Sequence, residues 1–161
     1  MAQNFTKGVK TNAVYGVLST TAATVYSDQV DMAGYEGCRF VVLAKSTGAS
    51  TGTAALSIVG TDTSTAASTS YAAVSGASIT ICKSTTASSK RIGTIDVFQP
   101  QKRYLKAKWV QLAKIALSGI VAEKYGPRIE PVAQSTYAAS AFLAATVAAS
   151  HVLTRMESTS T

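Results

Sequence analysis

The sequence has few of the side chains on which catalysis and metal binding usually depend. Its 161 residues include one histidine, His151, and two cysteines, Cys38 and Cys82. These three residues lie far apart in the chain and do not form a standard zinc-binding spacing. The sequence also lacks a Walker loop and a Gly-x-Gly-x-x-Gly loop. We therefore predict no enzymatic activity, no catalytic residue, no metal and no cofactor.

Charge is scarce too, since only 14% of the residues are Asp, Glu, Lys or Arg. The net charge is nevertheless +7. Residues 1–80 hold equal numbers of acidic and basic side chains, so the whole excess lies in residues 81–161. A basic region of this kind favours an acidic partner, which could be nucleic acid, an anionic membrane or an acidic protein surface.

Long hydrophobic runs are missing as well. No apolar stretch follows Met1, so we expect no secretory signal. The longest apolar segment, residues 137–153, is rich in alanine and is interrupted by serine and threonine, which makes it a poor membrane span. Both cysteines lie in apolar, strand-like runs and are expected to be buried, reduced thiols. These features predict a soluble protein that is made in the cytoplasm and has no membrane partner.

Short apolar runs separated by turn-rich segments dominate the first 131 residues. Runs typical of β-strands occur at 12–19, 39–45, 54–59, 78–82, 91–98, 104–112 and 115–125. We expect the second and third of these runs to form a hairpin, and the last two to pair with each other. In the last run, Ile115, Leu117 and Val121 are expected to share one face. Since no long amphipathic helix intervenes, the pattern predicts an all-β fold, an antiparallel β-sandwich or jelly-roll-like single domain.

The domain organisation follows from this pattern. Residues 1–11 are polar and are expected to form a flexible arm, while residues 12–131 form the sandwich, with an exposed loop at 60–76. Residues 132–161 are rich in alanine and lack strand-like alternation, so we predict an irregular C-terminal arm with a disordered end. An arm with large apolar side chains needs cover from a partner. Its candidate contact residues are Tyr137, Phe142, Leu143, Val147, Val152 and Leu153.

A basic cluster precedes and enters the strand at 104–112. Its members, and further candidate contact residues, are Lys102, Arg103, Lys106 and Lys108. Within the strand, apolar and basic positions alternate, so Lys106 and Lys108 are expected on one face together with Tyr104. Three interpretations remain open: a solvated face whose lysines prevent edge aggregation, a contact with an acidic protein, and a nucleic-acid site.

Three segments carry a more specific pattern. They are 31–43, 96–110 with Pro100, Lys102, Arg103 and Tyr104, and 118–132 with Val121, Ala122, Tyr125, Gly126, Pro127, Arg128, Pro131 and Val132. Together they resemble a family of small tailed-bacteriophage proteins encoded near the major capsid protein, the head-accessory proteins, also called decoration or cement proteins. The resemblance implies a β-sandwich or jelly-roll subunit on the outer surface of the capsid.

The expected function is therefore structural. We expect a virion protein that binds the outer capsid shell and stabilises it, made in the cytoplasm of a bacterial host. Its expected partners are the major capsid protein and further copies of itself, in a homo-oligomer on the shell, whereas nucleic acid is an unlikely partner. Three alternatives stay open: a tail or neck structural protein of the phage, a nucleic-acid-binding β-barrel, and a hydrolase that would depend on His151.

Overall fold

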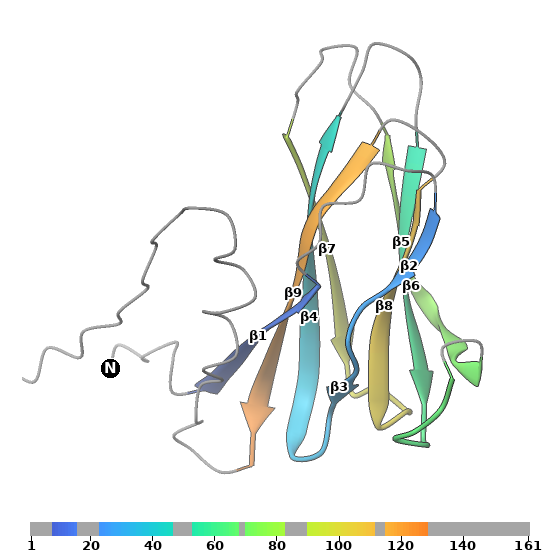
Figure 1. Cartoon of the computed structure of the whole chain (residues 1–161). Coiled ribbons are helices and arrows are strands. Elements are labelled where there is room, and N and C mark those ends of the chain that lie inside the picture. Colours follow the sequence, from blue (N-terminus) through green and yellow to red (C-terminus); the bar gives the residue numbers. More distant parts are fainter. Residues whose placement is uncertain are drawn as a thin grey trace, which may run out of the picture.

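Two antiparallel β-sheets, packed face to face, make up the part of the chain that the structure describes (Figure 1). The structure is a computed structural model, and it describes residues 8–15, 23–46, 53–67, 70–82, 90–111 and 115–128. Sheet A has the strand order β1 (Val9–Tyr15), β9 (Ile115–Pro127), β4 (Tyr35–Ser46), β7 (Lys90–Phe98). Sheet B has the order β2 (Ala23–Tyr26), β8 (Tyr104–Gln111), β5 (Thr53–Thr61), β6 (Ala72–Cys82), and the short β3 (Val30–Asp31) also pairs with β8.

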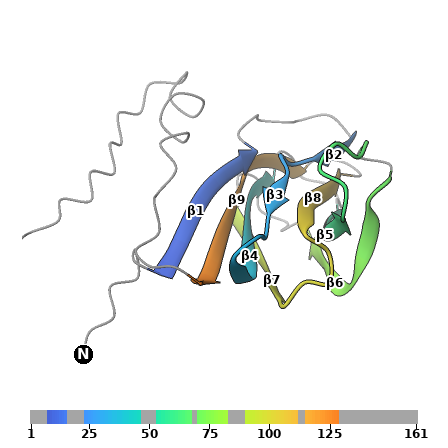
Figure 2. The ribbon, with the colours of Figure 1, turned by 90° about the horizontal axis from the view of Figure 1, so that it is seen from below.

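The chain passes repeatedly from one sheet to the other. β1 lies in sheet A, β2 and β3 in sheet B, β4 in sheet A, and β5 and β6 in sheet B. β7, β8 and β9 then lie in sheets A, B and A. Neighbours within a sheet are therefore mostly distant in sequence, as in the Greek keys of a jelly roll. The end view in Figure 2 shows the two layers, and the expected all-β antiparallel sandwich is confirmed.

Two expected pairings are wrong. β4 and β5, which contain the runs at 39–45 and 54–59, lie in different sheets and form no hairpin. β8 and β9 are separated in the same way, because β8 pairs with β2, β3 and β5 whereas β9 pairs with β1 and β4. Sequence neighbours often pair across short connections, but the connections from β4 to β5 and from β8 to β9 carry the chain to the opposite sheet.

Side chains from the inner faces of both sheets form one core. In β8, buried Leu105, Ala107 and Trp109 alternate with half-buried residues of the outer face. From the opposite sheet, Phe40 and Val42 of β4 are fully buried in the same cluster. Because strand side chains alternate between faces, this core fixes which residues each strand offers to a partner.

A β-bulge changes this alternation in β9. The register against β4 shifts after Leu43, which leaves Ser118 as an extra residue. As a result, Ile115 and Leu117 are buried whereas Val121 is only half-buried, opposite an outer-face residue of β4. The expectation that these three residues share a face is wrong, because the extra residue inverts the alternation.

The structure also shows where the expected segments begin and end. β1 starts at Val9, so the expected boundary at residue 12 falls inside a strand. β5 continues to Thr61 and β6 starts at Ala72, so the expected loop at 60–76 is strand at both ends. The arm expected at 132–161 lies outside the described residues.

Cys38 is a free thiol on the inner face of β4. Burial raises the pKa of this thiol to about 12, so it stays protonated and unreactive near neutral pH. The expected disposition, a buried reduced thiol, is confirmed for Cys38, whereas the side chain of Cys82 lies outside the described residues.

Candidate binding surfaces

The outer face of sheet B carries the basic residues that the alternation in β8 predicts. Lys106 and Lys108 are half-buried and lie on the face opposite the core. The Lys106 Nζ atom lies 4.8 Å from the centre of the Tyr71 ring, and the Lys108 Nζ atom lies 6.0 Å from that of Tyr26. An ammonium group at this distance is attracted to the negative face of an aromatic ring. Two lysines and two tyrosines from three segments thus form one surface, called here the basic face.

The other two basic candidates are committed to carboxylates. Lys102 donates to Asp62 at 2.5 Å, and Arg103 donates two hydrogen bonds to Asp31, at 3.0 Å from Nε and 2.9 Å from Nη2. These hydrogen bonds from Arg103 lower the pKa of the Asp31 carboxyl below its ordinary value. The four candidates are therefore not equivalent: two of them form ion pairs at the end of the sandwich, and two belong to the basic face.

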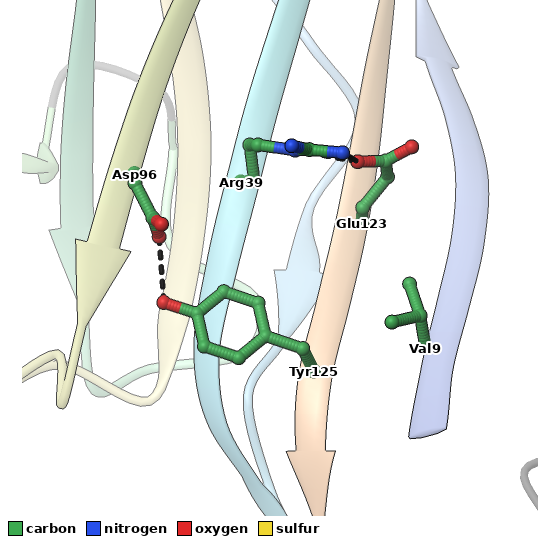
Figure 3. A pocket seen from close by; sticks show the side chains of 5 residues that line it. All are labelled: Val9, Arg39, Asp96, Glu123 and Tyr125. Atoms are coloured by element: carbon green, nitrogen blue, oxygen red, sulfur yellow. Dashed lines mark hydrogen bonds and ion pairs between the residues drawn. The ribbon is translucent and has the colours of Figure 1, made fainter. Parts of the chain in front are cut away.

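Two polar pairs lie side by side on the outer face of sheet A (Figure 3). Arg39 on β4 forms an ion pair with Glu123 on β9, with an Nε to Oε2 distance of 2.7 Å. The Tyr125 hydroxyl donates to Asp96 on β7 at 2.6 Å, and burial together with this bond raises the tyrosine pKa to about 12. The pairs line a shallow hollow of about 260 Å³. Since each of these polar groups already has a partner, the hollow offers no ready acid or base.

Gly37 makes the second pair possible. The Tyr125 ring crosses β4 directly over Gly37, and a Cβ atom built there would lie 2.2 Å from the ring. Only glycine leaves room for this close approach. The tyrosine thereby links β9 to β7 across the strand between them, and sequence analysis gave no sign of this role.

The three segments that carry the family resemblance meet at the lower end of the sandwich in Figure 1. The Arg128 amide donates to the Gly34 carbonyl at 3.0 Å, and the Gln99 amide donates to the Glu36 carbonyl at 2.7 Å. Gln99 has a φ of 47°, a conformation that is rare for residues other than glycine. An open groove of about 710 Å³ lies at this end, and its charged lining residues are Lys102, Arg103, Arg128, Glu36 and Asp62. The groove is therefore polar and of mixed charge rather than basic.

Sheet A also exposes large apolar side chains. Among the described residues these are Ile92, Phe98 and Leu43, with exposed fractions of 70%, 61% and 38%. All three lie on the outer face, two on the edge strand β7 and one on its neighbour β4. The sequence contained a signal for this surface, because apolar residues occur at both odd and even positions of β7.

The remaining candidates lie outside the described residues. These are His151 and the arm residues Tyr137, Phe142, Leu143, Val147, Val152 and Leu153. Within the part of the chain that the structure describes, no group of three or more His, Cys, Asp or Glu side chains is placed to hold a metal ion. No helix among those residues has the length and hydrophobicity needed to cross a membrane.

No family model and no curated protein matches this chain. The arrangement of the described side chains is thus the main guide to function, with two faces suited to contact: a basic face on sheet B and an apolar margin on sheet A.

Proposed function

We propose that this protein is a virion structural protein that binds the outer capsid shell of a tailed bacteriophage and stabilises it. The observation that carries the proposal is the meeting of the three family-like segments at one end of a two-sheet sandwich. Backbone hydrogen bonds and ion pairs join these segments, so the residues behind the resemblance act together in the fold. A binding role also fits the described surfaces, which offer a basic face on sheet B and exposed apolar side chains on sheet A.

Binding to the assembled shell is sufficient for stabilisation. A protein that binds the shell but not free subunits shifts the assembly equilibrium by mass action. Repeated copies on a symmetric shell add avidity to contacts that are weak one at a time. Lys106 and Lys108 of the basic face would meet acidic loops of the capsid protein, and such contacts mainly steer and orient the partner.

Reconstitution on shells tests this proposal. Phage heads that lack the protein are mixed with the purified chain, and cryo-electron microscopy measures its occupancy on the shell. Lys106→Glu with Lys108→Glu should lower the occupancy, and rising salt should lower that of the wild type, because the attraction is electrostatic. Lys45→Glu with Lys90→Glu is the matched control, since these exposed lysines lie on sheet A and the charge change is the same.

Each result has a clear meaning. Ordered density repeated over the shell, with only the basic-face variant impaired, supports decoration through sheet B. Density confined to one vertex or to the tail would move the protein to the alternative class of neck or tail proteins. Absence of density, combined with nucleic-acid affinity that falls steeply with salt, would overturn the proposal in favour of a nucleic-acid-binding domain.

A further inference from the structure

The edge strand β7 is exposed and pairs in a regular register with its neighbour. Among the described strands, it pairs only with β4. Nine successive residue pairs join the two strands, from Gly37 opposite Phe98 to Lys45 opposite Lys90, with no shift of register. The two most exposed large apolar side chains of the described residues, Ile92 and Phe98, stand on this strand.

Such an edge normally needs protection. Sheet edges present unpaired backbone groups, and proteins shield them with proline, inward-pointing charge or a bulge. Between Ile92 and Phe98, β7 has no proline, no lysine and no bulge. Its one charged side chain there, Asp96, is on the outer face and is bonded to Tyr125. The edge is therefore suited to the addition of another strand.

We propose that a second copy of this chain adds its β7 to this edge, antiparallel, with the two-fold axis at Ile95. Each Ile92 then lies opposite Phe98 of the second copy. The two-fold axis produces this pair twice, so both exposed apolar side chains of each copy gain an apolar neighbour. Thr94 lies opposite Asp96 of the second copy, where its hydroxyl can donate to the carboxylate. The result is one continuous sheet, with the two A sheets joined edge to edge.

The sequence of β7 favours this register over its neighbours. A shift that moves the axis to Thr94 sets Ile92 against Asp96 of the second copy and Phe98 against Lys90, so each apolar side chain faces a charge. Moving the axis to Gly93 sets Ile92 against Thr94 and takes Phe98 beyond the paired strand. Only the axis at Ile95 pairs the two exposed apolar side chains and places no like charges directly opposite each other. This self-complementarity is the reason to choose a second copy as the partner.

Analytical ultracentrifugation of the full chain, without shells, tests for the dimer. The wild type should sediment as a dimer, and Ile92→Lys with Phe98→Lys should weaken dimerisation by more than about tenfold, because each change occurs twice and sets like charges opposite each other. Leu43→Lys is the matched control, since it changes the same outer face one strand away from the edge. A monomeric wild type, or equal weakening by the control, would overturn the proposal.

Oxidative cross-linking tests the register. Ile92→Cys and Phe98→Cys proteins should form a disulfide-linked dimer when mixed, and neither should do so alone. Wild type controls for the native thiols, of which Cys38 is buried. Self-cross-linking of Thr94→Cys would instead place the axis at Thr94 and would contradict the register. Because these measurements use the free chain, their failure would leave the proposed binding to shells untouched.

Discussion

At the scale of single residues, Tyr125 provides a measurable link within sheet A. Its hydroxyl reaches Asp96 at 2.6 Å across the intervening strand β4. Tyr125→Phe keeps the ring and removes only this hydrogen bond, so the free energy of unfolding should fall by about 1 kcal/mol. Urea denaturation measures the change, and an unaltered midpoint would show that the bond contributes nothing to stability.

Gly37→Ala tests the same link between Tyr125 and Asp96, because Gly37 lies directly under the Tyr125 ring. The added methyl group would collide with the Tyr125 ring, which must then move away from Asp96. We expect a larger loss of stability than for Tyr125→Phe, because the ring loses its packing as well as its hydrogen bond. In the double variant the two losses should not add, and full additivity in urea denaturation would argue against a shared site.

The ion pair between Asp31 and Arg103 predicts an acid dependence of stability. Hydrogen bonds from Arg103 lower the pKa of Asp31 in the folded protein below the ordinary value of 3.8. The unfolded chain therefore binds a proton first as the pH falls. The stability from this pair is complete above the ordinary pKa and is lost as the pH falls through the depressed value. Asp31→Asn should flatten this part of the curve of unfolding free energy against pH, and an unchanged curve would contradict the assignment.

Residue-scale predictions that depended on local alternation succeeded in β8, where no bulge interrupts the strand, and failed in β9, where one does. Lys106 and Lys108 share a face because neighbouring positions of a strand point to opposite sides. The ion pairs of Lys102 and Arg103 could not be predicted in this way. Their partners lie 40 and 72 residues away in the sequence, and only the pairing of distant strands brings them together.

At the scale of elements, the strands were easier to predict than their partners. Apolar runs located the interior of β4, β5, β7, β8 and β9, because burial of one face requires alternation. Which strands pair depends on whether each connection stays in one sheet or crosses to the other. A short connection is compatible with both. The bulge at Ser118 could not be predicted from the sequence either, because a single extra serine does not alter the apolar pattern in a recognisable way.

Two adjacent valines in β4 test the orientation of a whole strand. Val42 is fully buried in the core, whereas Val41 is half-buried on the outer face. Val42→Ala should cost about 2 kcal/mol of unfolding free energy, because two buried methyl groups are lost and a cavity remains. Val41→Ala should cost less than about 1 kcal/mol in the same chemical denaturation experiment. Equal losses would mean that the strand does not keep one face in the core.

At the scale of the whole molecule, the sandwich separates its surfaces by sheet. Sheet B presents Lys106 and Lys108 on its basic face, while sheet A presents Ile92 and Phe98 at one edge. A subunit built in this way could bind a shell through one sheet and another copy through the other. The fold class was predictable because it follows from composition and period, whereas this division of surfaces depends on which strands share a sheet.

Residues 132–161, expected from the sequence to form an arm, are the subject of a prediction about the whole subunit. The strands in the described part of the chain all end by Pro127, so truncation after Pro131 should leave the free energy of unfolding nearly unchanged. Occupancy on shells should nevertheless fall further than in Lys106→Glu with Lys108→Glu. The reason is that each large apolar side chain of the arm, such as Phe142 or Leu143, would contribute roughly 1.5–3 kcal/mol when buried on a partner, before ordering costs. Comparable occupancy of the truncated and full-length chains would refute a binding role for the arm, and loss of folding would assign it to the domain itself.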